Sequence, residues 1–288
     1  MKMFNKIKFI LFGFMIAFSS GCSTIKLAYN NADFLLVYMI DDYYDLTDQQ
    51  HEKVKNDIVR ILKWHRKEEL PDYISIISQF ESKAKDGLTK EETVWTYDTM
   101  MNKYFHTVDY LFEDILSFMS VLNDRQIKAM EEKFAEDSEN SRKKYLASTR
   151  EEQLEKRVER TIDQAEDWLG DLSDRQIEQI SKLSRNLPLN NQMWIEERAR
   201  RNAELVVILR TYNTKEKLRQ PLRDWFFDTE KGRSAEYLKK QKDQYEKILE
   251  FAVAFDKLIT KKQREFALSK LNDYKDDFIQ LAAEGKES

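Results

Sequence analysis

The sequence predicts an all-α fold, an irregular multi-helix bundle of about ten helices without a β-sheet. Its 288 residues include only six glycines and three prolines, far fewer turn-forming residues than a strand-rich domain needs. A hydrophobic fraction of 41%, with 12% aromatic residues, is sufficient for a buried core. Signals for helix starts recur along the chain, and no strand-like alternation of useful length interrupts them.

A five-residue pattern marks several of these helix starts. It reads apolar residue, then Thr, Ser or Asn, then two polar residues, then Gln or Glu. In such a capping box the second residue accepts a hydrogen bond from a first-turn amide, and the last residue reaches back to the cap amide. The copies lie at residues 46–50, 88–92, 122–126, 172–176 and 259–263. Their spacing is too irregular for a regular solenoid.

Helix ends agree with these starts. Gly87 and Gly170 stand where helix C-termini favour glycine, and Pro71 and Pro188 mark further breaks. We therefore expect helices at about 29–44, 47–69, 71–86, 89–119, 123–146, 149–169, 173–187, 191–210, 214–228, 233–258 and 261–283. Residues 22–288 form one predicted helical domain, within which 22–169 and 170–288 are candidate sub-bundles.

The first 21 residues are typical of a secretory signal peptide. Lys2, Lys6 and Lys8 precede an uninterrupted apolar run at residues 9–18. As a helix this run is about 15 Å long, half of a bilayer core, which is too short to span a membrane. A basic leader followed by a short apolar core is the arrangement that secretion signals use.

The only cysteine of the chain directly follows this leader. The segment S-S-G-C-S ending at Ser23 resembles the lipobox of bacterial lipoproteins, with Ser19 where that motif usually has Leu. The resemblance implies cleavage after Gly21 and an N-terminal Cys22 that carries fatty acyl chains such as palmitate. Ser23 implies sorting to the periplasmic face of the outer membrane. The alternative is a buried free cysteine in a cytosolic protein, which leaves its place beside the leader unexplained.

Charge argues against nucleic acid as a partner. Without the leader the chain has 45 basic and 52 acidic residues, a net charge of −7, which repels a phosphate backbone. Basic clusters at 198–201, 239–242 and 261–264 are interleaved with acids. We interpret them as solvated helix faces with ion pairs between successive turns.

Catalytic and cofactor motifs are missing from the sequence. The histidines are His51, His65 and His106, and no spacing typical of zinc, di-iron or thiolate-metal sites occurs. Neither a glycine-rich phosphate loop nor a G-x-S-x-G nucleophile elbow is found. The sequence therefore predicts no enzyme, no cofactor and no metal site.

Two segments remain as candidate ligand or partner sites. In W-H-R-K-E-E-L-P-D-Y, His65 lies beside the apolar face of a predicted helix with Glu69 one turn later. This block is either a packed corner in which Glu69 orients the ring, or a pH-sensing or ligand-binding site. The acids near residue 41 are either a solvated corner or a cation or partner site. The candidate residues are Trp64, His65, Glu69, Tyr73, Asp41 and Asp42.

Several blocks of the sequence resemble an uncharacterised family of Gram-negative lipoproteins. They are L-A-Y-N-N from Leu27, D-D-Y-Y-D-L-T from Asp41 and W-H-R-K-E-E-L-P from Trp64. The resemblance implies an all-helical lipoprotein and brings no catalytic residues. The segment L-T-D-Q-Q from Leu46 is also similar to the L-T-x-x-Q motif of small periplasmic stress chaperones.

These observations favour a non-enzymatic function. The first hypothesis is a membrane-anchored helical scaffold that binds another envelope protein or an unfolded client, as a chaperone does. The alternative is a periplasmic ligand-binding protein or enzyme that uses a pocket at His65 and Glu69.

Overall fold

The computed structural model describes residues 23–287, and this part of the chain is helical throughout, with no strand. The predicted all-α fold is therefore confirmed. The elements are α2 (Ser23–Asn30), α3 (Ala32–Tyr44), α4 (Asp48–Trp64), the π-helix η2 (His65–Glu69), α5 (Leu70–Ala84), α6 (Lys90–Met119), α7 (Asp124–Tyr145), α8 (Arg150–Leu169), α9 (Asp174–Arg185), α10 (Asn191–Thr211), α11 (Lys215–Phe227), α12 (Ala235–Asp256) and α13 (Lys261–Glu287).

The capping boxes begin the helices as predicted. Reciprocal hydrogen bonds between the cap residue and the residue three positions later occur in all five copies. A sixth box, Thr149 with Glu152, starts α8. The sequence pattern missed it because Ser148, and not an apolar residue, precedes its cap. Gly87 and Gly170 follow helix ends at positive φ angles of 107° and 73°, which glycine adopts without steric cost.

Pro71 does not break the chain into two helices, and this prediction is wrong. The helix continues from α4 through η2 into α5, and Pro71 lies in the first turn of α5. In the π-turn the Leu70 amide donates to the carbonyl of His65, five residues back. Proline lacks an amide hydrogen, and a local π-turn is one of the ways in which a helix accommodates the lost bond.

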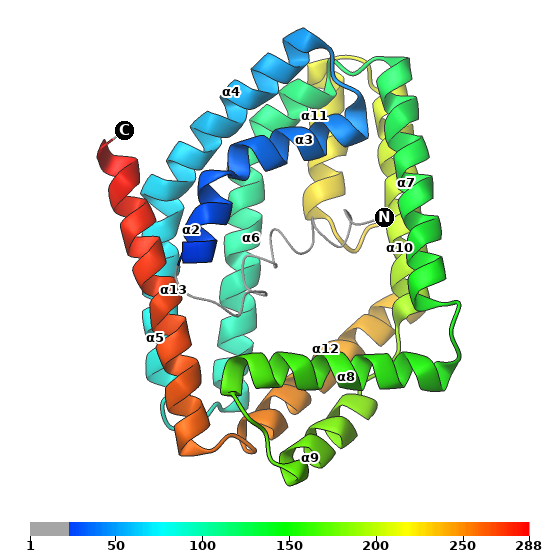
Figure 1. The fold of residues 1–288 in the computed structure, drawn as a ribbon. Helices are drawn as coiled ribbons and strands as arrows, with labels where there is room; N and C mark the ends of the chain where they lie inside the picture. Colours follow the sequence, from blue (N-terminus) through cyan, green and yellow to red (C-terminus); the bar gives the residue numbers. More distant parts are fainter. Residues whose placement is uncertain (1–22, 288) are drawn as a thin grey trace.

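The helices form an open frame (Figure 1). Helices α7 and α10 pack side by side along one side, and α5 and α13 along the other. Helices α3 and α4 lie at one end, while α8, α9 and α12 lie at the opposite end, and α6 runs between the two. Segments distant in sequence are therefore neighbours, because the C-terminal helix α13 packs on α5.

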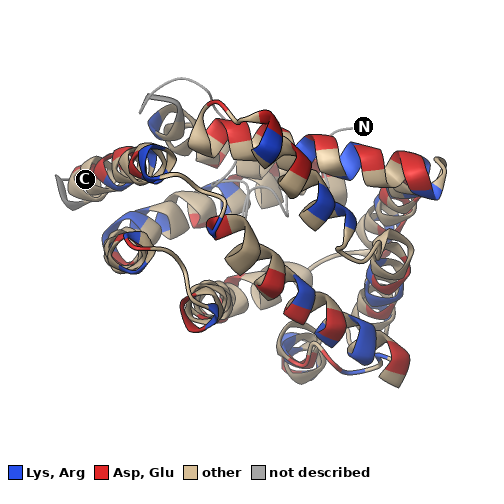
Figure 2. Ribbon diagram, turned by 90° about the horizontal axis from the view of Figure 1, so that it is seen from below, with Lys and Arg blue, Asp and Glu red and all other residues tan. Residues whose placement is uncertain are grey.

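Apolar residues of this frame gather where helices meet. The largest cluster joins α6, α7, α10 and α11 around residues such as Leu116, Met130 and Leu222. Smaller clusters join α3 to α4, α2 to α5 and α13, and α8 to α9. Basic and acidic residues alternate along the helices between them (Figure 2). Each junction thus has its own apolar core, and these junctions position the sites described below.

Candidate functional site

His65 lies at the meeting point of α2, α4 and η2. Its Nδ1 atom is 2.8 Å from the Tyr29 hydroxyl, and the ring lies between those of Trp64 and Tyr73, with centroids 6.3 and 5.9 Å away. Burial, with a smaller effect of the Lys103 charge, lowers the pKa of His65 to about 4. The ring is neutral at pH 7, and its Nδ1 shares a hydrogen bond with the Tyr29 hydroxyl. We call this group the His65 junction.

Glu69 does not orient the His65 ring, contrary to the packed-corner interpretation. Its side chain is 1% exposed, and its carboxylate lies 2.7 Å from Lys103 Nζ and 3.2 Å from His106 Nε2, both on α6. The π-turn explains the difference. Its hydrogen bond joins residues five apart, which widens the turn and rotates Glu69 away from the position that it would have four residues after His65 in an α-helix. Glu69 therefore ties η2 to α6.

The two aromatic candidates of this block also have partners on neighbouring helices. Trp64 stacks on Tyr110 of α6 with a centroid distance of 3.5 Å and an interplanar angle of 7°. The Tyr73 ring lies 6.4 Å from that of Phe278 on α13. Burial, and then the charge of Glu69, raises the pKa of Tyr73. Trp64, His65, Glu69 and Tyr73 thus hold α2, α6 and α13 around η2.

Asp41 and Asp42 make different contacts at the corner between α3 and α4. The Leu46 amide donates to Asp41 Oδ1 over 2.9 Å and so closes the turn. Asp42 lies 2.9 Å from Lys133 Nζ on α7. The two carboxylates contact different elements and do not converge on one site.

The other site predictions concern the N-terminus and metal binding. Gly21 and Cys22, the predicted cleavage and acylation residues, lie outside the described residues. Among residues 23–287 no group of three or more His, Cys, Asp or Glu side chains is placed to hold a metal ion. In the same range no helix has the length and apolarity required to cross a bilayer.

The capping boxes that end in Gln pair with each other across the fold, which the sequence did not predict. Gln50 and Gln126 exchange amide hydrogen bonds of 3.2 and 2.7 Å, and so join the starts of α4 and α7. Gln176 and Gln263 exchange bonds of 2.8 and 3.3 Å, which join α9 to α13. In the other two boxes the terminal residue is Glu: Glu152 is exposed and Glu92 is half-buried, and each bonds to its own cap residue. A Gln in place of Glu at the last position of a capping box was the sequence signal that could have indicated this pairing.

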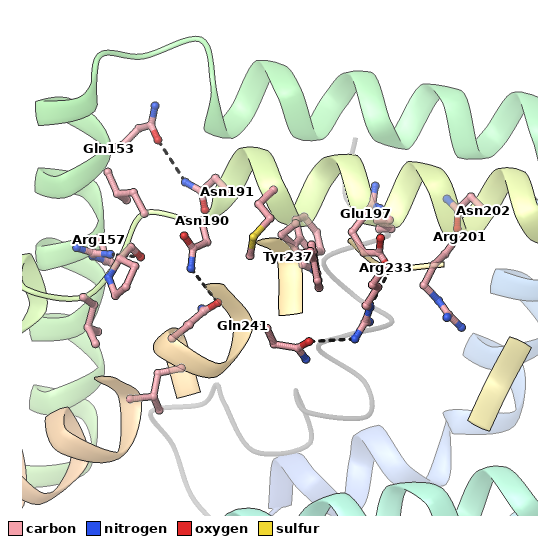
Figure 3. Close-up of a pocket in the computed structure, with 18 of the residues that line it drawn as sticks. Gln153, Arg157, Asn190, Asn191, Glu197, Arg201, Asn202, Arg233, Tyr237 and Gln241 are labelled. Carbon is pink, nitrogen blue, oxygen red and sulfur yellow. Dashed lines mark hydrogen bonds and ion pairs between the residues drawn. The ribbon is translucent and has the colours of Figure 1, made fainter. Parts of the chain in front are cut away.

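A cavity of about 670 Å³ lies between α8, α10 and α12 (Figure 3). The loop before α10 and Trp225 of α11 complete its wall. Five arginines line it, namely Arg157, Arg160, Arg198, Arg201 and Arg233, together with a single carboxylate, Glu197. Asn190, Asn191, Gln153 and Gln241 add amide groups from three sides. We call this site the arginine cavity.

The arginine cavity changes the interpretation of the basic cluster at 198–201. Arg200 does pair with Glu197 and Glu204 one turn away. Arg198 and Arg201, however, are half-buried in the cavity wall, over the rings of Trp194 and Trp225 at 5.0 and 4.7 Å. The solvated-face interpretation is therefore wrong for these two arginines. The reason is that α8 and α12 face α10 across the cavity, a tertiary arrangement that has no signal in the sequence.

Comparison with known proteins adds a family without adding an activity. No curated protein and no solved structure matches this chain. The model of a family of unknown function, DUF6279, matches residues 42–238, which is more than half of the 288 residues. The matched region includes the His65 junction apart from α2 and α13, and most of the arginine cavity. The chain therefore belongs to the DUF6279 family.

Proposed function

We propose that this chain is a lipoprotein of the bacterial envelope, acylated at Cys22 and held at the periplasmic face of the outer membrane. The lipobox-like segment supports the anchor. Helix α2 (Ser23–Asn30) directly follows Cys22 in the sequence. Acyl chains on Cys22 would therefore hold the helical body close to the membrane surface. Two or more acyl chains give stable attachment, because each buried CH₂ contributes about 0.8 kcal/mol.

The observation that carries this proposal is an apolar surface next to the anchor. Leu27, Phe34, Leu35 and Tyr38 of α2 and α3 are exposed by 65, 70, 45 and 56%. We call them the N-terminal apolar patch. Several large apolar side chains exposed along two successive helices favour a contact with a membrane or a protein. Since this patch begins five residues after Cys22, we assign it to the lipid surface.

The scaffold role is supported by the contacts of the titratable groups. His65 and Glu69 have partners within the fold, in Tyr29 and Lys103, so we propose a non-enzymatic function and do not retain a pocket at His65. Long helices joined at separate junctions present extended faces to another envelope protein or an unfolded client. The net charge of the mature chain disfavours nucleic acid.

The anchor is tested by the intact mass of protein purified from its native membrane. We expect an N-terminal cysteine at position 22 whose added mass equals that of the acyl groups. As a control, the chain from Ser23 onward is secreted from an ordinary cleavable leader, and it should leave the membrane fraction. A native chain that keeps Met1 and a free thiol would refute the proposal.

The direction in which the protein faces is tested by site-specific photocrosslinking in intact cells. A crosslinking residue in place of Phe34 should label lipid. The same residue in place of Val207, which is exposed on α10, should label a protein partner if α10 faces the periplasm. Protein adducts from Phe34 and lipid adducts from Val207 would reverse the proposed orientation.

A further inference from the structure

The arginine cavity has the size of a ligand site. Its volume of about 670 Å³ falls within the range of roughly 300–1,000 Å³ that small-molecule sites occupy. The lining comes from four helices and two loops, and so it is formed by the tertiary fold and not by one local motif. Nothing in the anchor or scaffold role requires such a space.

Two of the arginines in the cavity, Arg157 and Arg201, form no ion pair with a carboxylate among the described residues. Arg233 is neutralised, because its Nε lies 2.9 Å from Glu197 Oε1. Arg157 donates only to backbone carbonyls, those of Pro188 at 3.1 Å and Arg185 at 3.4 Å. Its Nε is buried with no hydrogen-bond partner among the described residues. A partly buried guanidinium without a counter-ion carries a desolvation cost, and a bound anion would reduce that cost.

Arg201 on α10 is likewise half-buried. The only hydrogen bond of its guanidinium among the described residues goes to the carbonyl of Trp225, and the guanidinium lies 4.7 Å from the centre of that indole ring. Burial lowers the pKa of both Arg157 and Arg201. The charges of Arg160 and Arg150 add to the effect at Arg157, while the charge of Glu204 partly opposes it at Arg201. The electrostatic preference of the cavity is therefore for a negative ligand.

The other residues that line the cavity indicate the chemistry of the uncharged part of such a ligand. Asparagine and glutamine amides surround the cavity and donate to or accept from hydroxyl groups. Several are already aligned by bonds to each other, as in Asn190 to Gln244 at 3.1 Å and Asn191 to Gln153 at 3.4 Å (Figure 3). Trp194 and Tyr237 offer apolar ring surface between these amides. A fatty or purely aromatic ligand would leave the amides and arginines desolvated without partners.

We propose that the arginine cavity binds an acidic carbohydrate, a sugar that carries carboxylate or phosphate groups. Arg157 and Arg201 bind the acidic groups, since the planar guanidinium forms paired hydrogen bonds with either anion. The amides of α8, α10 and α12 bind the hydroxyls, and the aromatic rings contact the C–H faces of the sugar. This proposal is independent of the anchor. If the cavity binds no acidic carbohydrate, the proposed membrane attachment is unaffected.

Calorimetric titration of the complete purified protein in detergent tests the assignment. The probes are digalacturonate, glucose 1-phosphate, neutral lactose and inorganic phosphate. We expect saturable binding of at least one acidic sugar, at least about tenfold tighter than lactose or phosphate alone. The preferred acidic sugar separates a carboxylate from a phosphate ligand. Equal affinity for lactose, or no saturable binding of either acidic sugar, would overturn the proposal.

Substitutions locate the binding. Arg157→Gln and Arg201→Gln should each weaken the preferred acidic sugar about tenfold, while Arg175→Gln on the exposed face of α9 should leave its affinity unchanged. Because Arg157 also holds the loop before α10, Arg157→Lys keeps the charge and should retain part of the affinity. The melting temperature is measured for every variant. Full affinity in both folded Gln variants would exclude the cavity as the site.

Discussion

At the scale of single residues, the buried neutral His65 makes the stability of the fold depend on pH. Burial lowers its pKa to about 4, against about 6.5 in the unfolded chain. Between these two pH values His65 is protonated in the unfolded state but not in the folded state. Its contribution to the free energy of unfolding is therefore fully present above pH 6.5 and is lost as the pH falls towards 4. We expect the free energy of unfolding to decrease by about 2 kcal/mol between pH 7 and pH 5 from this residue.

Urea denaturation at the two pH values checks this prediction. His65→Gln cannot titrate, and its loss of stability between pH 7 and pH 5 should be smaller than that of the native chain by that amount. His51→Gln is the matched control, since His51 is exposed on α4, and it should keep the native slope. An unchanged slope in His65→Gln would show that the ring is protonated or solvated in the folded state.

Sequence spacing identified the residues of the His65 junction but not their partners. The apolar positions before His65 correctly put it on a buried face. The partner of Glu69 could not be predicted, because a five-residue π-turn has no reliable signal in the sequence and it moved the carboxylate to Lys103. Tyr29 lies 36 residues from His65, and only the packing of α2 brings the two together.

At the scale of helices, the last residue of a capping box distinguishes the boxes that pair with another box from those that only cap their own helix. It is Gln in the first group and Glu in the second. Gln126 is fully buried, donates to Gln50 and to the Asp45 carbonyl, and still accepts from the Asn123 amide. A carboxylate at this position can cap the helix equally well, as Glu92 does for α6. It cannot donate the two bonds across the helix junction. The pairing therefore requires glutamine, while capping alone does not.

Gln126→Glu tests the pairing without removing the cap. We expect a loss of about 2 kcal/mol or more in the free energy of unfolding, because a buried carboxylate would face the amide oxygen of Gln50 and the Asp45 carbonyl. The reverse change in a box that caps its helix without pairing with another box, Glu92→Gln, should alter stability by less than about 0.5 kcal/mol. Equal effects in the two variants would mean that the glutamines act only as caps.

Helix starts were predictable because capping is local chemistry. The hydrogen bonds of a box join residues three apart, so Thr47, Thr89 and Asn123 could be assigned from the sequence alone. The pairing of boxes 76 or 87 residues apart depends on which helix ends meet in the frame. Pro71 shows the opposite limit, since a local rule predicted a break and the π-turn of η2 lets the helix continue through the proline.

At the scale of the whole molecule, average charge did not indicate where charges meet. The mature chain is acidic, and this argument against nucleic acid says nothing of a local excess of arginine. Arg157 and Arg201 are 44 residues apart in sequence and share one cavity because α8 and α10 face each other across it. Each lies among acidic neighbours in the sequence, which made both resemble surface residues. The arginine cavity could therefore be found only from the fold.

Membrane contact through the N-terminal apolar patch is a property of the whole folded body and can be measured without the anchor. The chain secreted from Ser23 onward, without acyl groups, should bind weakly to phosphatidylethanolamine–phosphatidylglycerol vesicles in cosedimentation. Combined Phe34→Ser and Tyr38→Ser substitutions should lower the partition coefficient about tenfold, because two exposed aromatic rings would no longer enter the bilayer interface.

The control for this prediction is the double variant Val207→Ser with Phe266→Ser. It removes two similarly exposed apolar residues from α10 and α13 and should leave partitioning unchanged. Since both double variants remove two large apolar side chains from the surface, a difference between them reports orientation and not general hydrophobicity. Equal partitioning of the two variants would place the membrane on another face.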